Sequence, residues 1–529
     1  MAQLGLLFST LFWFLFFVLS VFASPLEPRQ LQRPKRTENG VHIPIFRTVS
    51  RGLRQRGELT GAIGLGDDAD VSYSFLVTVG GMESPLVLDT GSSDLWMASD
   101  ACKNCKTNLP LFPQASFLST GWSVNLQYGD SHTGTHASGL VGTDGIVFAG
   151  ISVPNQYFAA INNTNTNVLR TGSAGIFGLG FALNSVIWNE VFANKFMSQS
   201  SSRRSISPRR LSSSSNYGTR FFPNLQNLIS GAQKRATSAE ALTSAVLESY
   251  STYGPAVTRM VTTNSLSSAM FTISLQRDTM DIGGNAGILS LGELPAGVQE
   301  SALTWAPVRK YPSALQAPAN SPNETYPIAW EIFIDDVFLD GARLPRSNLS
   351  SSSIALSGLI DTGNSLIRGP GDVVKMINSQ VGKTFDCTTP HTLAFSIGGK
   401  LFPIDARDFA SPASKKNVSQ CSANVVETDS PVVGQGYQYS WSLGDPFIKG
   451  VLASFYYAAL KTAVDSAISN NGGKEYTTSD VAPTGVVEGS VGPSGVPQAV
   501  GKIETNGVRR KAGNLLLVLA VPVIAWLAS

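Results

Sequence analysis

Two aspartates in matching sequence contexts are the residues best suited to do chemistry. The stretch LVLDTGSS at 86–93 is echoed by GLIDTGNSL at 358–366, so an apolar run leads into Asp-Thr-Gly in each copy. A single Asp-Thr-Gly would carry little weight, because Asp and Gly are common turn residues. Two copies, separated by 361 − 89 = 272 positions, predict two similar lobes that present matching loops to each other.

Asp89 and Asp361 would then form a pair of neighbouring carboxyl groups. Two carboxylates held close together do not readily ionise together, so their proton affinities separate. The ionised partner can accept a proton from a water molecule between them, and the protonated partner can donate to the carbonyl oxygen of an amide. This chemistry is amide hydrolysis, and it requires no metal, cofactor or covalent nucleophile.

The residues after each aspartate would hold the pair in place. Glycine lacks a Cβ, so the two loops can turn sharply and approach each other. The threonines can form hydrogen bonds across the junction, and a polar side chain follows in each copy. We therefore expect six residues to support the geometry of the pair: Thr90, Gly91, Ser92, Thr362, Gly363 and Asn364.

The elements that carry these loops are predicted to be strands. Short apolar runs such as 75–79 and 85–88 are rich in β-branched and aromatic residues and are bounded by Gly, Ser, Asn and Asp, which is typical of an all-β protein. A chain of 529 residues is too long for one compact core, so two domains plus appendages are expected. The formal net charge of +2, without a sustained basic stripe, argues against a nucleic-acid partner.

Five ordered motifs resemble those of the pepsin-like aspartic proteases, over a stretch from Val71 to Tyr457. DTGSSDLW at 89–96 resembles the first catalytic motif, and LQYGD at 126–130 resembles the flap, the hairpin that closes over substrate. The second Asp-Thr-Gly is followed by Gly-Pro at 369–370, as in relatives. GIFGLG at 175–180 and WSLGDPF at 441–447 resemble the segments that brace the catalytic loops.

The resemblance implies a bilobal all-β fold with a deep interlobe cleft. It implies an aspartic endopeptidase, with Asp89 and Asp361 as the catalytic residues, which acts as a monomer on peptide or protein substrates and needs no cofactor. The flap and substrate-binding residues would be Tyr128, Gly129, Asp130 and Trp96, with Tyr128 hydrogen-bonded to Trp96.

The sequence departs from the family pattern in three places. Asn364 stands where the family usually has Ser or Thr, a hydroxyl that bonds the second aspartate, and its amide N–H can donate instead. The residues after Phe447 lack the usual pattern of a closing strand. The pro-segment offers no lysine near its end that would block the pair.

The ends of the chain predict a secreted protein held at a surface. The apolar run 4–22 followed by Ala23 is typical of a cleaved signal peptide rather than a retained anchor. Near the other end, Asn506-Gly507, a basic spacer and the apolar run 515–528 have the layout of a glycosylphosphatidylinositol (GPI) signal. A transmembrane helix is the alternative, but it needs about 20 apolar residues. These features resemble the fungal, GPI-anchored, yapsin-like type, with Asn506 as the attachment site at the plasma membrane or cell wall.

The expected organisation follows from these features and from shifts in composition. Segment 24–60 is basic and is interpreted as a processed pro-segment rather than a core element. A Ser/Arg-rich stretch cannot bury a core and is expected to be a disordered insertion. The predicted parts are a signal peptide (1–23), the pro-segment (24–60), an N-terminal lobe (61–275) with the insertion (198–220), a C-terminal lobe (276–470), a flexible stalk (471–506) and an anchor signal that is removed (507–529).

The four cysteines fit an oxidising compartment. Disulfides Cys102–Cys105 and Cys387–Cys421 are the simplest of three possible pairings, and a zinc site is the alternative for the first pair. Glycosylation is expected at four sequons, those of Asn162, Asn323, Asn348 and Asn417.

Two other classes of function are considered beside the protease. One is a catalytically inactive pepsin-like scaffold that serves as a cell-surface binding or wall protein, which the presence of both aspartates and Tyr128 disfavours. The other is a serine hydrolase, but the sequence has no Gly-x-Ser-x-Gly elbow and none of its four histidines lies in a recognisable triad context.

Overall fold

A computed structural model describes the parts of the chain that carry most of the motifs. The described residues are 34–49, 71–129, 134–199, 239–276, 285–309, 327–414, 417–431, 439–457, 483–485, 490–491, 497–498 and 518–519. The predicted signal peptide lies outside them, as do Asp130, Asn323, Asn506, most of the Ser/Arg-rich insertion, and nearly all of the stalk and anchor signal.

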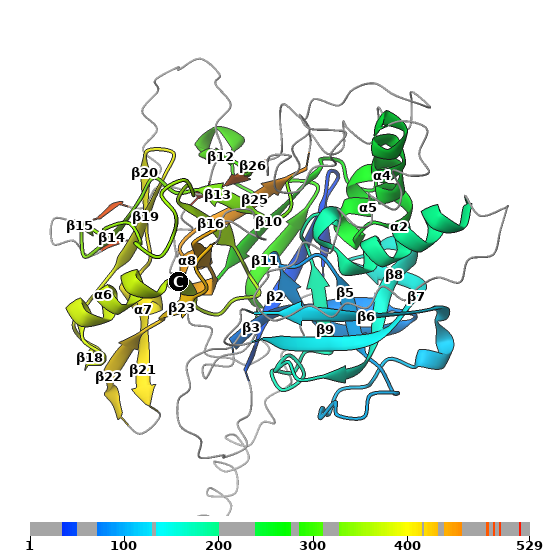
Figure 1. The fold of residues 1–529 in the computed structure, drawn as a ribbon, viewed down its shortest axis with the longest axis horizontal. Coiled ribbons are helices and arrows are strands. Elements are labelled where there is room, and N and C mark those ends of the chain that lie inside the picture. The colour runs from blue at the N-terminus through cyan, green and yellow to red at the C-terminus, as the bar shows by residue number, and fades with distance from the viewer. Residues whose placement is uncertain are drawn as a thin grey trace, which may run out of the picture.

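The chain folds into two lobes built mainly of strands, so the expected bilobal all-β fold is confirmed. In Figure 1 the N-terminal lobe, in blue and cyan, lies to one side, and the yellow strands of the C-terminal lobe lie to the other. Strands from the middle and the end of the chain run between them. Side chains alternate as a half-buried strand requires, because every second residue from Tyr73 to Val79 is fully buried.

One 15-stranded sheet extends from the N-terminal lobe to the junction between the lobes. Its order is β12-β26-β25-β10-β11-β2-β3-β4-β9-β5-β8-β7-β6, with β1 paired to β2 and β29 to β25. Its strands are β1 (Lys35–Arg36), β2 (Val41–Val49), β3 (Val71–Val79), β4 (Met82–Asp89), β5 (Leu95–Ala98), β6 (Leu118–Tyr128), β7 (Thr135–Phe148), β8 (Ile151–Thr164), β9 (Gly175–Gly178), β10 (Met270–Leu275), β11 (Asn285–Leu291), β12 (Trp305–Pro307), β25 (Leu452–Tyr456), β26 (Pro483–Gly485) and β29 (Val518–Leu519).

The C-terminal lobe is built from smaller sheets. Their orders are β13-β16-β24-β17-β23, β15-β14-β19-β20 and β18-β22-β21, and β27 pairs with β28. The strands are β13 (Glu331–Phe333), β14 (Asp336–Leu339), β15 (Ala342–Arg343), β16 (Ser357–Ile360), β17 (Ile367–Pro370), β18 (Phe385–Asp386), β19 (Leu393–Ile397), β20 (Lys400–Pro403), β21 (Ala410–Ser414), β22 (Asn417–Ala423), β23 (Val425–Thr428), β24 (Trp441–Leu443), β27 (Ser490–Val491) and β28 (Pro497–Gln498).

The same three-strand arrangement ends in an aspartate in both lobes. In the N-terminal lobe β4 runs parallel to β9, which pairs antiparallel with β5. In the C-terminal lobe β16 runs parallel to β24, which pairs antiparallel with β17. The internal repeat in the sequence therefore corresponds to a repeat in topology, which places the two Asp-Thr-Gly loops in equivalent positions.

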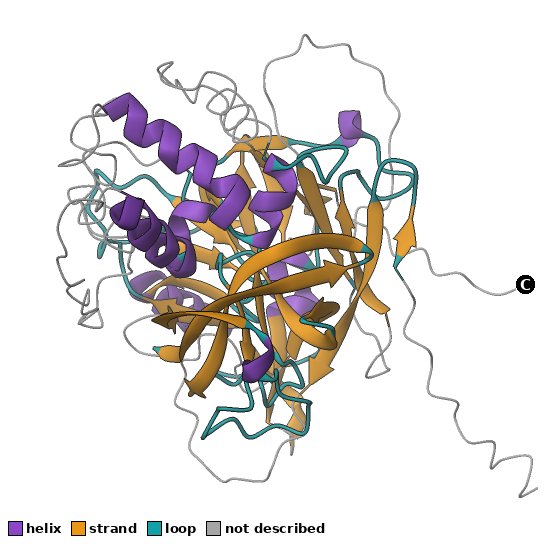
Figure 2. Cartoon of the chain, turned by 90° about the vertical axis from the view of Figure 1, so that its right-hand side faces the viewer, coloured by secondary structure: helices purple, strands orange, loops and turns teal. Residues whose placement is uncertain are grey.

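Helices that the sequence analysis did not anticipate cover part of the N-terminal lobe. Figure 2 shows several helices gathered on one side of the strands. Asp94 receives hydrogen bonds from the first backbone N–H groups of α2, those of Val186 at 2.9 Å and Ile187 at 3.1 Å. The helices are α2 (Val186–Gln199), α4 (Ala239–Tyr253), α5 (Ala256–Thr262), α6 (Gly371–Val381), α7 (Ala406–Phe409) and α8 (Asp445–Ile448), with short 3-10 turns η1 (Gln114–Ser116), η2 (Ala182–Asn184) and η3 (Glu300–Ala302).

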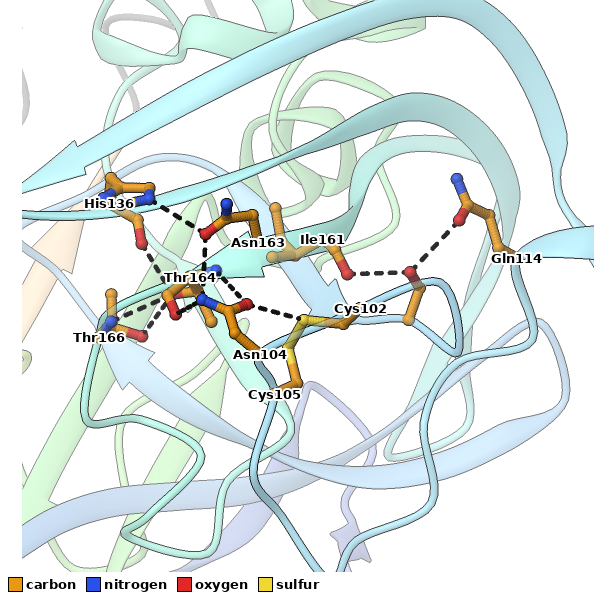
Figure 3. The surroundings of a disulfide bond; sticks show 10 residues. Cys102, Asn104, Cys105, Gln114, His136, Ile161, Asn163, Thr164 and Thr166 are labelled. Atoms are coloured by element: carbon orange, nitrogen blue, oxygen red, sulfur yellow. Dashed lines mark hydrogen bonds between the residues drawn. A yellow bond between two sulfur atoms is a disulfide. The ribbon is translucent and has the colours of Figure 1, made fainter.

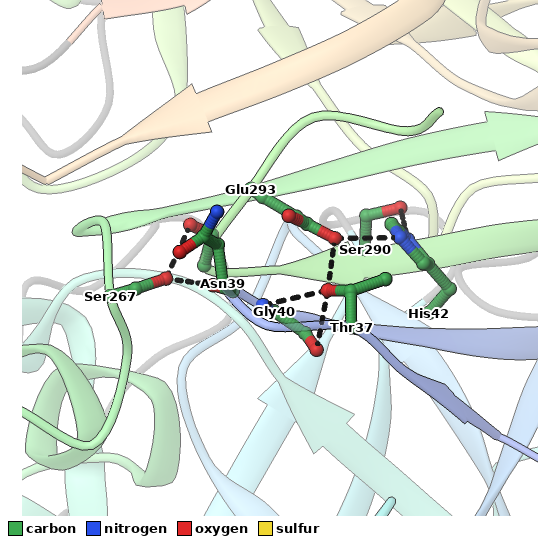
Figure 4. Close-up of polar contacts among 8 residues, drawn as sticks. Thr37, Asn39, Gly40, His42, Ser267, Ser290 and Glu293 are labelled. Atoms are coloured by element: carbon green, nitrogen blue, oxygen red, sulfur yellow. Dashed lines mark hydrogen bonds and ion pairs between the residues drawn. The ribbon is translucent and has the colours of Figure 1, made fainter. Parts of the chain in front are cut away.

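The interpretation of segment 24–60 as contributing nothing to the core is wrong for residues 41–46, and residues 24–33 and 50–60 lie outside the described ranges. Strand β2 lies inside the large sheet between β11 and β3, and Val41, Ile43 and Ile45 are buried. Beside it His42 contacts Ser290 at 2.8 Å and Glu293 at 2.9 Å (Figure 4). The basic composition concealed an alternating apolar pattern, and Val41–Val49 form a strand of the large sheet.

The residues after Phe447 form a strand although they lack the usual pattern of a closing strand. Residues Leu452–Tyr456 form β25, which pairs antiparallel with β10 over five residue pairs. Phe455 stacks on Phe271 with ring centroids 4.6 Å apart. Leu452, Ala453 and Phe455 are the apolar side chains that this strand buries.

Across the described ranges, no helix is both long and apolar enough to cross a bilayer.

Candidate active site

Asp89 and Asp361 lie together at the ends of their strands. Asp89 is the last residue of β4 and is 3% exposed, whereas Asp361 follows β16 and is half-buried. The carboxyl of Asp361 is a hydrogen-bond partner of the Asp89 carboxylate and so lowers the Asp89 pKa, against the larger raising effect of burial. The structure therefore brings the two predicted acids close together where the two loops meet.

Thr90 and Thr362 cross-link the two loops through a pair of equivalent hydrogen bonds. The Thr90 hydroxyl donates to the carbonyl oxygen of Ile360 at 2.7 Å, and the Thr362 hydroxyl donates to that of Leu88 at 2.7 Å. Each hydroxyl also accepts the backbone N–H of the other threonine at 3.0 Å. Both side chains are buried, so the junction between the lobes is held by fully satisfied polar groups.

The glycine of the first motif is required by the closeness of the carboxyl pair. A Cβ added to Gly91 would lie 2.4 Å from Oδ1 of Asp361, which is closer than real Cβ atoms come to a neighbour. The backbone N–H groups of Gly91 and Gly363 instead donate to their own aspartates, at 2.8 and 3.0 Å. The loops thus supply equivalent backbone donors to both acids.

The protonation of the pair follows from its surroundings. Burial raises the pKa of Asp89, and hydrogen bonds from Ser92 and Gly91 oppose this. Burial and the charge of Asp89 together raise the pKa of Asp361 to about 7, although Gly363, Arg368 and Ser442 favour its ionised form. A protonated Asp361 beside an ionised Asp89 can serve as acid and base in one reaction.

The two lobes support their aspartates differently beyond the glycines. The Ser92 hydroxyl donates directly to Oδ2 of Asp89. The expectation that the Asn364 amide donates to Asp361 in the same way is wrong. Its Nδ2 donates to the Ser442 hydroxyl at 2.9 Å, and that hydroxyl donates to Oδ2 of Asp361 at 3.3 Å.

Tyr128, which is predicted to belong to the flap, is hydrogen-bonded to Trp96 as expected. Trp96 Nε1 donates to its hydroxyl at 2.7 Å. Burial, together with the charges of Asp94 and Asp89, raises the pKa of Tyr128 well above its usual range, so its hydroxyl stays protonated and available as a donor. Gly129, next along the chain, is exposed and has a φ of 84°, a backbone conformation that favours glycine.

Both cysteine pairs are disulfide-bonded, Cys102 with Cys105 and Cys387 with Cys421. The zinc alternative for the first pair therefore does not apply. Figure 3 shows Asn104, between the first two cysteines, joined to Thr164 by two hydrogen bonds. Asn104 Nδ2 donates to the Thr164 carbonyl oxygen at 2.8 Å, and the Thr164 backbone N–H donates to Asn104 Oδ1 at 3.1 Å. This small loop is thus fixed to the end of β8.

The sequon asparagines within the described residues lie at the surface or at a strand end. Asn162 and Asn348 are exposed, and Asn417 begins β22.

Four residues that contribute to the site were not identified from the sequence: Arg368, Ser442, Trp330 and Tyr457. Ser442 was inside a recognised motif, but its contact with Asp361 depends on strand pairing. Trp330 Nε1 donates to the Leu179 carbonyl oxygen at 2.9 Å, and the Tyr457 hydroxyl donates to the same oxygen at 2.7 Å. These contacts tie the bracing loop of the N-terminal lobe to later parts of the chain.

Comparison with known proteins places the motifs in a wider context. The family profile described as eukaryotic aspartyl protease matches residues 72–222 and 240–466, which include both Asp-Thr-Gly loops. An aspartic protease of Phaffia rhodozyma is 26% identical over 417 residues, covering 75% of this chain and 76% of that protein. Cathepsin E of Mus musculus is 23% identical over 403 residues, covering 73% and 78%. Rhizopuspepsin-2 of Rhizopus niveus is 34% identical over 142 residues, which span 26% of this chain and 36% of that protein.

Proposed function

This chain belongs to the eukaryotic aspartyl protease family, and we propose that it hydrolyses peptide bonds with a water molecule activated between Asp89 and Asp361. Its family makes it an aspartic-type endopeptidase with peptide or protein substrates. The meeting of the two Asp-Thr-Gly loops, cross-linked by Thr90 and Thr362 with Gly91 close against the Asp361 carboxyl, is the observation that carries the residue assignment.

In the proposed reaction Asp89 is the base and Asp361 is the acid. Asp89 receives hydrogen bonds from Gly91, Ser92 and Asp361, which stabilise its negative charge. It takes a proton from the attacking water. Asp361 keeps its proton up to about pH 7 and donates it to the carbonyl oxygen of the scissile bond. The product is a tetrahedral diol, whose collapse releases the amine after proton transfer from the pair.

Thr90, Gly91, Ser92, Thr362, Gly363 and Asn364 would keep the two acids in register. Tyr128, fixed by Trp96, would close over the substrate with Gly129 as the pivot of the hairpin. Asp130 follows the pivot in sequence, so it would favour substrates with a basic residue near the scissile bond.

The test of the residue assignment is hydrolysis by two isosteric variants. Asp89→Asn and Asp361→Asn should each abolish cleavage of a peptide library at every pH, while the fold is retained, because an amide cannot titrate. Tyr128→Ala should weaken closure and leave measurable turnover. Substantial hydrolysis by either Asn variant would place the chemistry on other residues, and an inactive wild-type chain that still binds a statine-type inhibitor would favour the inactive surface scaffold.

We further propose that the enzyme is secreted and held at the cell surface by a GPI anchor attached at Asn506, in the manner of the yapsin-like type. The layout of small residues, basic spacer and terminal apolar run supports this location. The Gly/Ser/Pro/Thr-rich stretch before Asn506 would act as a stalk, and the sequons of Asn162, Asn323, Asn348 and Asn417 would carry glycans. Phosphatidylinositol-specific phospholipase should release the enzyme from intact cells. Equal partitioning of the full-length and Asn506-truncated chains between cells and medium would contradict the anchor.

A further inference from the structure

The support of Asp361 is built from three polar residues that differ from those at the equivalent positions around Asp89. Asn364, Arg368 and Ser442 are 6%, 7% and 4% exposed. Ser442 donates to Asp361 at 3.3 Å and accepts from Asn364 Nδ2 at 2.9 Å. Arg368 Nε in turn donates to Asn364 Oδ1 at 3.4 Å. A chain of hydrogen bonds therefore runs from a buried guanidinium to the carboxyl.

The topological repeat identifies what stands at the same positions in the other lobe. Ser442 is the partner of Leu359 on β16 and of Arg368 on β17. Ile176 is the partner of Val87 on β4 and of Trp96 on β5. The positions are equivalent, because Leu359 and Val87 lie equally far before their aspartates. Arg368 and Trp96 likewise lie equally far after theirs. An apolar pair in one lobe thus corresponds to a polar pair in the other.

The polar residues of the C-terminal lobe compensate for the hydroxyl that its loop lacks. In the N-terminal lobe the loop itself provides the hydroxyl, because Ser92 reaches Asp89 directly. In the C-terminal lobe the loop has the longer Asn364, whose amide is directed to β24 instead. A serine on β24 then supplies the missing hydroxyl, and the arginine opposite it satisfies the remaining amide oxygen together with the backbone N–H of Leu366.

We propose that Ser442, held by Asn364 and Arg368, is a positioning residue that orients Asp361 and sets the alkaline limit of activity. The proposal rests on the assignment of Asp361 as the catalytic acid. Both the hydroxyl and the guanidinium favour the ionised carboxylate, so they lower the pKa of Asp361, against the larger raising effects of burial and of Asp89. Removing either support should let Asp361 keep its proton to higher pH, so the alkaline limb of the activity profile should move upward.

Few other charges face this carboxyl within the described residues. Asp89 approaches it from the N-terminal lobe and Arg368 from β17. Asp445, at the start of α8, donates its backbone N–H to the Asn364 carbonyl oxygen at 2.8 Å. On β23, Glu427 pairs with Lys375 of α6 at 3.6 Å. Both partners of this last pair are more than half exposed, so solvent screens their effect on Asp361.

The deciding experiment measures kcat and KM against pH for Ser442→Ala in the full chain, with a peptide substrate. The alkaline limb should rise by about one pH unit, which corresponds to about 1.4 kcal/mol, because a hydrogen bond to an ionised group is lost. Arg368→Met should move it in the same direction, and Arg368→Lys, which retains the charge, should move it less. Ser440→Ala is the matched control. It removes another buried hydroxyl two residues away, which bonds the Ser357 carbonyl oxygen and not the acid.

Rescue separates positioning from general damage. Asn364→Ser in the Ser442→Ala background places a hydroxyl where Ser92 stands in the other lobe, and it should return the alkaline limb toward the wild-type position. A lower kcat with both limbs unmoved, or a shift equal to that of Ser440→Ala, would overturn the proposal. Asp361→Asn distinguishes the two levels of inference: its activity would reject the proposed function itself, whereas an inactive Asp361→Asn with an unshifted Ser442→Ala would reject only the positioning role.

Discussion

Replacing Asp361 by asparagine should make the protein more stable at neutral and alkaline pH while it destroys activity. The reason is that Asp361 is placed for chemistry in surroundings that disfavour its charge. Burial and the nearby Asp89 raise its pKa to about 7, whereas an aspartate in an unfolded chain titrates near 4. Asparagine has almost the same shape and stays neutral throughout.

The sign and size of the effect follow from the proton balance. Below about pH 4 the carboxyl is protonated in both the folded and the unfolded states, so it makes no difference to stability. Between about pH 4 and pH 7 the unfolded chain loses its proton first, and the free energy of unfolding falls as the pH rises. The shift from 3.8 to about 7 amounts to about 4 kcal/mol at 1.36 kcal/mol per pH unit. This is an upper bound, because Asp361 keeps some contact with solvent.

The assay is urea unfolding at pH 4, 5.5, 7 and 8, followed by tryptophan emission. Trp96, Trp188, Trp330 and Trp441 are fully buried in different parts of the chain, so both lobes contribute to the signal. Asp361→Asn should match the wild type at pH 4 and exceed its free energy of unfolding by up to about 4 kcal/mol at pH 8.

The control is Asp386→Asn at an exposed aspartate. Hydrogen bonds from Thr388 lower the pKa of Asp386, so any effect of this change with rising pH has the opposite sign. Wild-type and Asp361→Asn stabilities that run parallel from pH 4 to pH 8 would refute the reasoning, because they would mean that folding does not disfavour the charge of Asp361.

Three further changes test the frame around the acids. Gly91→Ala should abolish activity and destabilise the fold, because its Cβ would meet the Asp361 carboxyl at 2.4 Å. Gly145→Ala is the control and should do neither, because no atom lies within 4 Å of its added Cβ. Equal unfolding midpoints of the two variants would contradict this reasoning. Removing the Cys387–Cys421 disulfide by double alanine substitution should lower the free energy of unfolding by about 4 kcal/mol through loop entropy, because its sequence separation is 34 residues. For Cys102–Cys105, with a separation of 3 residues, the loss should be about 1.6 kcal/mol. Denaturant unfolding that ranks them in reverse would count against the entropic account. Tyr128→Phe keeps the ring and loses the contact with Trp96; it should raise KM more than it lowers kcat, and a kcat loss as large as that of Asp361→Asn would contradict the flap role.

The parts of the site that were predictable from sequence are those whose chemistry is local and repeated. Each acid, its threonine and its glycine are consecutive, and their roles follow from what two facing loops need. The alternating core of β3 could likewise be recognised within one short run. No distant partner has to be known for these inferences.

The parts that were missed depend on pairing between distant residues. Ser442 contacts Asp361 across 81 positions, and only the register of β24 between β16 and β17 directs its side chain there. For β2 a local signal existed, since Val41, Ile43 and Ile45 alternate, but the surrounding arginines favoured another interpretation. Helix α4 also had a signal, because buried Val246, Leu247 and Tyr250 have helical spacing.

The late position of β24 and β25 in the chain has a consequence for the cell that makes this protein. Both acids have been synthesised once residue 361 is added, but the brace from Tyr457 to the Leu179 carbonyl oxygen requires 457 − 361 = 96 further residues. At translation rates of about 5–20 residues per second, this interval lasts roughly 5–20 s. During that time the growing chain carries the reactive groups without the frame that aligns them. The order of synthesis therefore means that the contact bracing the N-terminal loop can form only after nearly the whole C-terminal lobe has been made.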